Sequence, residues 1–389
     1  MITLRPITLL LLCVAAAVLA GDIAFELARP VQAGKSVLID FDAFYLVGQM
    51  IGEGQLQGAY DPAVFDARQQ ALVGYGEPLI WSYPPPFNLV VAPFAQAPNW
   101  LSYLLFMGGT LAAYLWILRA IAGPQFHATL VLCLALFPIV IRSGQNSFLT
   151  GGLIGLACLL ALRRSVWAGV PLGLMVIKPH LALGVGLWSV LDRRWGMVAV
   201  AFAVSLLACG VATLAYGPAA WGWFIDAAAA TQDFLRAGQY PLFRMTSVFA
   251  FGLSAGLGPT LAMVLHLCSA AAAIALLIAV QVSGAGLRRR IGAAVFVSAL
   301  ISPYNYDYDL AMLAFSLALL MPAIAARNTR LERGAILIGM WVVGFYGVAV
   351  SLGMDRGVLG TDWRGISICG PVLVLTGLVI LRGALRARS

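Results

Sequence analysis

The chain has 389 residues, of which 61% are hydrophobic and only 10% are charged, and its mean hydropathy is +0.92. These values lie outside the usual range of soluble globular domains. They exclude a disordered chain, a nucleic-acid-binding tail and a cytosolic enzyme with one compact core, and they favour an all-α polytopic membrane protein. The formal net charge of +8 would suggest an anionic partner if the basic residues formed one patch, but they are scattered at the ends of apolar segments.

The apolar segments predict about twelve membrane-spanning helices in a single integral membrane domain, residues 1–389. A hydrocarbon core of roughly 30 Å requires about 20 apolar residues as a helix. Residues 1–20 also fit a secretory signal peptide, which is the alternative for the first span. The predicted spans are 7–27, 100–118, 125–141, 146–162, 165–177, 180–191, 196–216, 259–282, 291–302, 310–326, 334–353 and 365–381.

The charges of the alternating loops predict the orientation. One side holds 15 of the 24 basic residues and only two of the 16 acidic residues. By the positive-inside rule this side is the cytoplasm, and both termini then lie there. Lys178 falls at an outer turn between two short spans, because Arg163-Arg164 and Arg193-Arg194 must both stay inside. The alternative is one long helix over 165–191 that places Lys178 at mid-bilayer, which is energetically costly.

Two long outer segments, 28–99 and 217–258, predict where function resides, since the inner connections are short and basic. Within the first segment we expect an amphipathic helix over 41–51 at the membrane surface, with Asp40 near its N-cap.

Two more features of the first outer segment are predicted. A second short helix opens at Asp61-Pro62 and runs to about Leu72, because Pro suits the first helical position. The apolar run 87–95 is too short to span the bilayer, so we expect it to be re-entrant or interfacial.

Polar residues beside the bilayer gather in the same outer leaflet as Asp40 and Asp42. A site with carboxylates, fixed cations and aromatic rings at headgroup depth suits a lipid-phosphate substrate. The cations would bind the phosphate, a carboxylate would abstract a proton, and the rings would cover sugar faces. The polar elements are Arg142 with Gln145 and Asn146, Lys178 with His180, Arg244, and Tyr304 to Asp309.

With these residues in place, the chain resembles glycosyltransferase family 87, the integral membrane transferases of GT-C type that use polyprenyl-phosphate sugars. The resemblance runs from about Ser36 to Leu320, and it rests on the order and spacing of short motifs. These are Asp40 to Tyr45, Gly58 to Asp61, Tyr83 to Phe87, Gly144 to Asn146, Ala168-Gly169, Lys178-Pro179, Arg193 to Trp195 and Ser302-Pro303.

The resemblance implies inverting transfer of a hexose, often mannose, from a polyprenyl-phosphate carrier to a lipid or glycan acceptor. The reaction is expected on the outer face of a bacterial plasma membrane, among membrane lipids. It implies that Asp40 is the general base. Two interpretations are open for Asp42, which either shares the catalytic site or simply faces water. The expected donor-phosphate ligands are Lys178, Arg142 and Arg244, and the expected substrate-binding residues are Tyr83, Gln145, Asn146, His180, Tyr304, Asn305 and Asp307.

No cofactor, metal or nucleic-acid partner is expected, because the chain has no DxD, P-loop or glycine-rich nucleotide motif in a polar context. The six cysteines all lie in apolar runs without metal-ligand spacing. One departure from the family pattern concerns the residues after Ser302-Pro303. Many members have Trp and then His there, whereas this chain has Tyr306 to Asp309, so the role of that histidine would fall to Asp307, Asp309 or His180.

Structural alternatives remain open for several of these residues. Asp40 could be only a helix cap, Lys178 could snorkel to a headgroup, and Asp307 and Asp309 could cap a helix that begins near Leu310. The alternative function is a transporter or flippase of a polyprenyl-linked or glycolipid substrate, which predicts two related halves and ionisable residues at mid-bilayer. An inactive accessory subunit with the same fold is a third possibility.

Overall fold

The computed structural model describes residues 39–73, 79–236, 240–355, 357–359 and 365–385. Within these ranges the chain is helical, as predicted, and its one β-bridge is an isolated pair between Met245 and Tyr306. The predicted first span, 7–27, lies outside the described residues, as does the beginning of the first outer segment.

The predicted spans from residue 100 onward coincide with helical segments to within a few residues, because the apolar runs that the bilayer requires are also continuous helix formers. Several are continued by short 3₁₀ segments, of which η5 (Met175–Ile177), η6 (Pro179–Ala182) and η8 (Asp307–Met312) adjoin the site described below. The helices are α6 (Asn99–Ala122), α7 (Phe126–Cys133), α8 (Phe137–Ser143), α9 (Ser147–Leu162), α10 (Gly169–Leu174), α11 (Leu183–Leu191), α12 (Trp195–Tyr216), α15 (Pro259–Val282), α16 (Leu287–Ile301), α17 (Leu313–Arg327), α18 (Arg330–Asp355) and α19 (Cys369–Leu385).

Five segments of the described chain are long and apolar enough to cross a membrane, which indicates an integral membrane protein. They are Asn99–Ser143, Trp195–Tyr216, Pro259–Val282, Asp307–Arg327 and Arg330–Met354. Others, such as Ser147–Leu162 and Pro179–Leu191, are apolar but shorter. The total of twelve crossings therefore stays a prediction.

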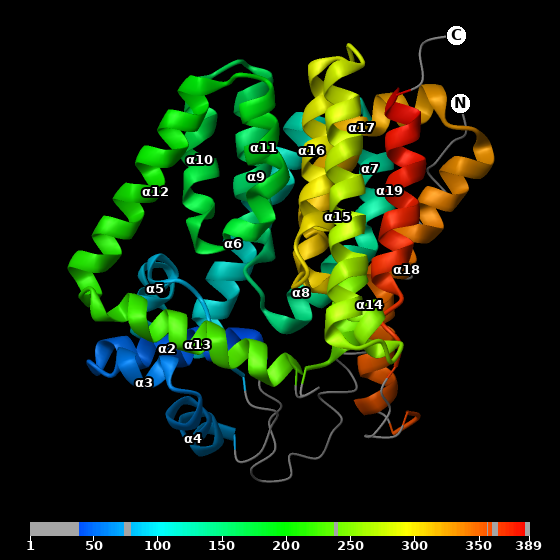
Figure 1. The fold of residues 1–389 in the computed structure, drawn as a ribbon. Coiled ribbons are helices and arrows are strands. Elements are labelled where there is room, and N and C mark those ends of the chain that lie inside the picture. The colour runs from blue at the N-terminus through cyan, green and yellow to red at the C-terminus, as the bar shows by residue number, and fades with distance from the viewer. Residues whose placement is uncertain (1–38, 74–78, 237–239, 356, 360–364, 386–389) are drawn as a thin grey trace.

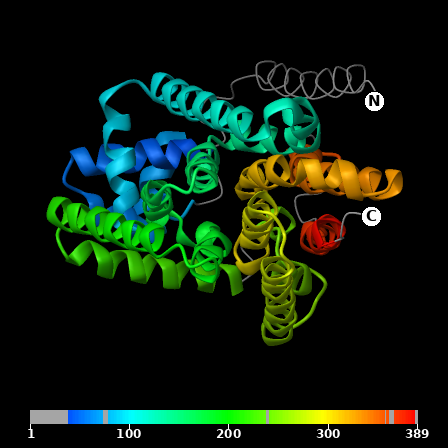
Figure 2. The same ribbon diagram turned by 90° about the horizontal axis from the view of Figure 1, so that it is seen from above.

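The upright helices form two groups that are bridged along one side. Figure 1 shows α10 to α12 on one flank and α14 to α19 on the other, and Figure 2 shows α6 to α8 running along one side of both groups. The core lies along α16 and α17, where residues 291–300 and 313–321 are buried without a break. In contrast, α12 exposes Phe202, Leu207 and Leu214, as expected of a helix that faces lipid.

The helices of the two outer segments lie across one end of the bundle (Figure 1). Both predicted short helices are present, and the second begins as expected, with Asp61 Oδ1 accepting hydrogen bonds from the backbone N–H groups of Ala63 at 2.9 Å and Val64 at 3.2 Å. The apolar run 87–95 forms α5 and η1, which pack against α2. The elements are α2 (Asp40–Gly52), α3 (Leu56–Tyr60), α4 (Pro62–Val73), α5 (Pro85–Val91), η1 (Ala92–Gln96), α13 (Ala219–Arg236), η7 (Leu242–Arg244) and α14 (Val248–Ser254).

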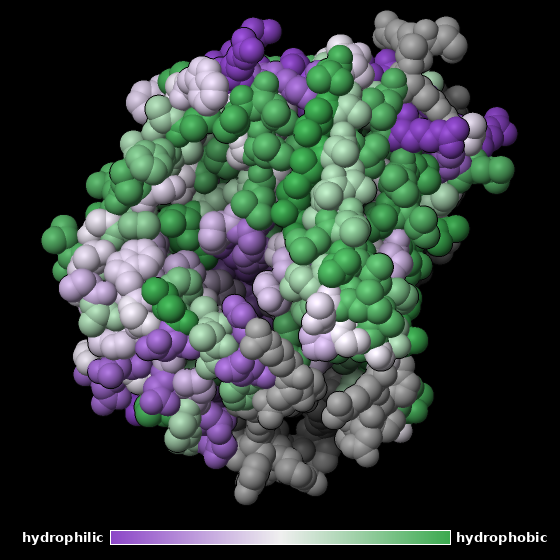
Figure 3. Space-filling view, viewed as in Figure 1, coloured by the Kyte–Doolittle hydropathy of each residue, from purple (hydrophilic) through white to green (hydrophobic). Residues whose placement is uncertain are grey.

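The connections that the sequence assigns to the inner side lie together at the opposite end (Figure 1). There, Asp192 accepts a hydrogen bond from Arg194 Nε at 2.7 Å, pairs with Arg290, and accepts another from Gln281 Nε2 at 2.8 Å. These contacts join the α11–α12 turn to α15 and α16. Figure 3 shows hydrophobic surface over the upright helices and hydrophilic residues at both ends.

The packing of α11 on α16 depends on a close approach at Gly184. Its backbone N–H donates to Ser298 Oγ at 2.9 Å, and a Cβ at this position would lie 2.2 Å from the Ala294 carbonyl oxygen. Gly186, two residues further along α11 and so on the opposite face of the helix, has open space where its Cβ would lie.

We expect Gly184→Ala to lower the free energy of unfolding by about 1–3 kcal/mol, because the backbones of α11 and α16 must separate to admit the methyl group. Gly186→Ala is the matched control, and it should be neutral or stabilise by up to about 1 kcal/mol through helix propensity. The measurement is the thermal unfolding midpoint of the protein in detergent. Equal midpoints for the two variants would contradict the packing described here.

Candidate active site

The two aspartates at the start of α2 have different surroundings. Asp42 Oδ2 accepts the backbone N–H of Ile39 at 3.0 Å, and its Oδ1 accepts from Asn99 Nδ2 at 2.9 Å. Asp42 therefore caps the helix and ties it to α6. Asp40 is the first helical residue rather than the cap, and its Oδ2 is buried without a hydrogen-bond partner among the described residues.

Aromatic packing fixes the beginning of α2. Phe41 is fully buried and stacks on Phe94, with ring centroids 5.4 Å apart, and it meets Tyr103 edge-on at 5.3 Å. One turn later, Phe44 meets Tyr83 edge-on at 5.7 Å. Because these rings pack on two faces of the helix, they fix the position of the turn of α2 that carries Asp40.

The turn between α8 and α9 comes close to α2 at Gly144, which has a left-handed φ of 65°. A Cβ at Gly144 would lie 2.5 Å from the Phe41 Cβ, so glycine is required both for the backbone conformation and for the contact. The turn places the Gln145 side chain near enough to Asp40 to lower the pKa of its carboxyl. Gln145 Oε1 also accepts from Tyr83 Oη at 3.1 Å and from the Asn146 N–H at 3.2 Å.

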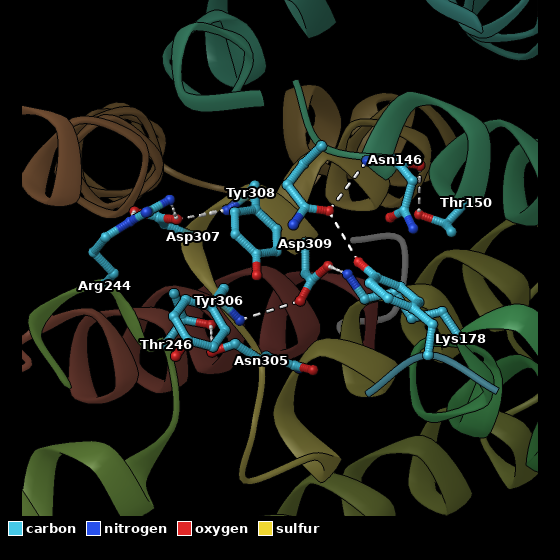
Figure 4. A network of polar contacts seen from close by, with 12 residues as sticks. Asn146, Thr150, Lys178, Arg244, Thr246, Asn305, Tyr306, Asp307, Tyr308 and Asp309 are labelled. Carbon is cyan, nitrogen blue, oxygen red and sulfur yellow. Dashed lines mark hydrogen bonds and ion pairs between the residues drawn. The ribbon is translucent and has the colours of Figure 1, made fainter. Parts of the chain in front are cut away.

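Two buried ion pairs belong to one network of polar contacts (Figure 4). Lys178, between η5 and η6, binds Asp309 at 2.5 Å, and both side chains are at least nine-tenths buried. Arg244, at the end of η7, binds Asp307 through two hydrogen bonds of 3.1 and 3.2 Å. Both cations interact electrostatically with Asp40. Asp40, Lys178 and Arg244 are far apart in sequence, and the fold brings this candidate base and these two cations into one cluster.

The segment before η8 is fastened to the segment after η7. Thr246 donates its backbone N–H to the Asn305 carbonyl at 2.8 Å, next to the Met245–Tyr306 bridge. Asn305 is fully buried and donates its Nδ2 to the Ala299 carbonyl at 2.9 Å. This pairing holds Arg244 opposite Asp307.

Burial raises the pKa of Asp40 above its ordinary value of 3.8, while Arg244, the hydrogen bond from Gln145 and Lys178 oppose that shift. Burial disfavours the charged form, and the cations favour it. A carboxyl whose pKa is raised toward neutrality suits proton abstraction better than an exposed aspartate does. The arrangement can therefore supply a base and two anion-binding groups in one place.

The remaining residues predicted for the site are placed as follows. Tyr83 lies under Lys178, with 5.9 Å between the Nζ and the ring centroid. The Asn146 side-chain oxygen and nitrogen and the His180 Nε2 are buried without partners among the described residues. Arg142 is half-buried in the last turn of α8. Tyr304 is 41% exposed and meets Phe249 edge-on.

Two residues of the cluster were not assigned a substrate role from the sequence, namely Tyr308 and Asp309. The prediction that Asp309 caps a helix is confirmed, since its Oδ2 accepts the Tyr306 N–H at 3.2 Å, but its Oδ1 also holds Lys178. The sequence signal that could have identified Tyr308 and Asp309 is the alternation of tyrosine and aspartate over residues 306–309.

In the described part of the chain, no group of three or more His, Cys, Asp or Glu residues is placed to hold a metal ion.

The fold and the cluster define a helical membrane protein with a group of buried charged residues at one end of its bundle. The sequence pattern of glycosyltransferase family 87 matches residues 81–303, more than half of the 389 residues, and the chain belongs to this family. Membership indicates a membrane glycosyltransferase. No curated protein and no solved structure gives a significant match.

The matched range contains Tyr83, Gln145, Lys178 and Arg244, but it begins after Asp40 and ends before η8. The family match therefore covers only the central part of the region, about Ser36 to Leu320, over which the motifs of the chain resemble the family. The assignment of Asp40 rests on the geometry that brings it to residues of the matched range.

The Lys178–Asp309 pair generates a stability prediction. Asp309→Asn keeps an acceptor for the Tyr306 N–H but leaves Lys178 buried without a carboxylate, which should cost about 3–5 kcal/mol. The double variant Lys178→Met/Asp309→Asn should recover most of this loss. The exposed pair of Arg68 and Glu53 is the matched control, and Glu53→Gln should cost less than about 1 kcal/mol. Denaturant unfolding in detergent measures all three, and additive losses in the double variant would show that the pair is not coupled.

Proposed function

We propose that the chain is an inverting glycosyltransferase that moves a sugar from a polyprenyl-phosphate carrier to a hydroxyl of a lipid or glycan acceptor. Mannose is the expected sugar. Family membership supports the reaction class. The observation that carries the proposal is the buried Asp40 carboxyl oxygen, which has no partner among the described residues and lies beside two cations.

In this mechanism Asp40 accepts the proton of the acceptor hydroxyl as that oxygen attacks the anomeric carbon. The bond between the anomeric carbon and the phosphate oxygen breaks in the same step, so the configuration at that carbon inverts. The carrier phosphate leaves with the bonding electron pair, and Lys178 and Arg244 stabilise its negative charge. Arg142 remains a proposed ligand of the phosphate, whereas Asp42, for which the sequence left open a share in the catalytic site, makes the contacts of a helix cap and takes no step in this mechanism.

The sugar would be held by the hydrogen-bonding groups that the protein leaves unpaired. Buried polar atoms that lack a protein partner normally find a ligand or a water molecule. Asn146, His180 and Asn305 each present such an atom within the described residues. Aromatic residues beside them, Tyr83 above all, would cover a face of the ring.

The proposed position in the membrane follows from the charges of the loops. The basic connections gather at one end, and the helices α2 and α13 lie across the other (Figure 1). By the positive-inside rule the cluster faces the extracytoplasmic leaflet of a bacterial plasma membrane. On the face shown in Figure 3, a hydrophilic hollow lies between the two hydrophobic helix groups, and a lipid-linked donor could reach the cluster from this side.

The function is tested by incubating membranes that carry the protein with radiolabelled polyprenyl-phosphate-mannose and a lipid extract of the host. We expect a labelled product with the native protein and a loss of roughly 10²–10⁴-fold in Asp40→Asn, which cannot accept the proton. Asp42→Asn should retain transfer, because its carboxylate is engaged by Ile39 and Asn99. Asp226→Asn, at an exposed position of α13, is the control for expression and folding. Full transfer by Asp40→Asn would refute the base assignment, and the absence of product from any polyprenyl-linked sugar would favour transport.

The raised pKa of Asp40 gives a prediction for pH dependence. The base acts in its ionised form, so kcat/KM should fall as the pH drops through the pKa of Asp40. Gln145→Leu removes a hydrogen bond that lowers this pKa, so the acid limb of the profile should move to higher pH. Tyr83→Phe, which removes only the hydroxyl that binds Gln145, should cause a smaller shift in the same direction. An acid limb that is unchanged in Gln145→Leu would contradict this account.

A further inference from the structure

Tyr308 lies between the two cations (Figure 4). Its ring centroid is 5.0 Å from Lys178 Nζ and 5.5 Å from Arg244 Cζ. The ring of Tyr306 stacks against it at 5.3 Å, with an angle of 7° between the planes. One aromatic side chain therefore contacts both groups that are proposed to bind the donor phosphate.

The backbone of η8 fixes this ring through the same carboxylates that hold the cations. Asp307 Oδ1 accepts the backbone N–H of Tyr308 at 2.9 Å and also binds Arg244. Asp309 accepts the backbone N–H of Tyr306 with one oxygen and binds Lys178 with the other. A change in the position of either carboxylate would move a cation and the ring together.

We propose that Tyr308 is a positioning residue whose ring keeps both Lys178 and Arg244 in place, so that both can contribute to binding of the donor phosphate. This inference rests on the proposed function, and it names a residue that neither the family match nor the sequence analysis assigns. Tyr308 also interacts electrostatically with Asp40, so the base and both cations share this neighbour.

The physical reason is that a ring attracts a cation without neutralising it. Lys and Arg side chains have several rotatable bonds, and ordering them at the moment of binding costs conformational entropy. A carboxylate orders the side chain but also competes with phosphate for its charge and its N–H donors. The ring face attracts the cation through its quadrupole and leaves those donors available. A phosphate can then share the cations with Asp307 and Asp309 while the ring keeps them in place.

The test measures binding of a polyprenyl phosphate that carries no sugar to the full-length protein in detergent, together with the steady-state constants of transfer. The variants are Tyr308→Leu, which lacks the ring, and Tyr308→Phe, which keeps it. Tyr346→Leu is the control, because Tyr346 is a half-buried tyrosine of α18 that donates to the Ile366 carbonyl and has no cation contact among the described residues.

We expect Tyr308→Leu to bind the polyprenyl phosphate about tenfold more weakly and to raise the donor KM by a similar factor. The acceptor KM should be unchanged. Tyr308→Phe should bind within about twofold of the native protein, because its ring face is retained. Unchanged binding in Tyr308→Leu would overturn the proposal, as would equal losses in Tyr308→Phe and Tyr308→Leu, which would assign the effect to the hydroxyl.

Two further measurements keep the result interpretable. If thermal unfolding shows that Tyr308→Leu is not folded, Tyr308→Met takes its place, with the same expected result. Binding of the polyprenyl phosphate requires no transfer, so the two proposals can fail separately. Ring-dependent binding without sugar transfer would support the positioning role and refute the proposed reaction, whereas transfer that is insensitive to the ring would refute the positioning role alone.

Discussion

The structure depends on the pairing of buried charges at η8. Asp307 and Asp309 are each no more than 2% exposed, and isolated ions at that depth would be strongly unfavourable. Each carboxylate is matched by one cation from a distant part of the chain and by one backbone N–H of its own turn. Because every member of this network requires another, the segments that carry Lys178 and Arg244 are held against η8, and the charged cluster is formed as a consequence.

The helical fold could be predicted from the sequence almost completely. Long apolar runs interrupted by charged turns specify where helices begin and end, and the boundaries of α12 and α15 agree with the prediction to within a residue. Crossing a bilayer is harder to predict than helix formation. Residues 291–302 and 165–177 are as apolar as longer spans but lie in a bundle where protein can replace lipid as the surrounding medium. Length and hydropathy cannot distinguish these two environments.

The candidate site could be predicted only in part. Residue chemistry was enough to select Asp40, Lys178 and Arg244, because charged side chains beside apolar runs are rare and costly. It was not enough to separate Asp40 from Asp42, since that difference depends on which carboxylate meets the N–H of Ile39. The double role of Asp309 was also hidden. Its local pattern is that of a cap, whereas its partner Lys178 is 131 residues away, and no local spacing rule reports such a contact.

The contacts that join the two helix groups differ between the ends of the molecule. At the end with the basic loops, Asp192 binds Arg194, Arg290 and Gln281, so one carboxylate serves several partners from both groups. At the other end the groups meet through cations that an anionic ligand can share. At the end with the basic loops, the two helix groups can separate only if the ionic cluster around Asp192 breaks, and no ligand replaces those contacts. At the end with Lys178 and Arg244, an anionic ligand that breaks contacts between protein groups replaces them with its own. For the proposed polyprenyl-phosphate donor, this difference predicts lateral access at the end that holds the charged cluster without loosening of the end that holds the basic loops.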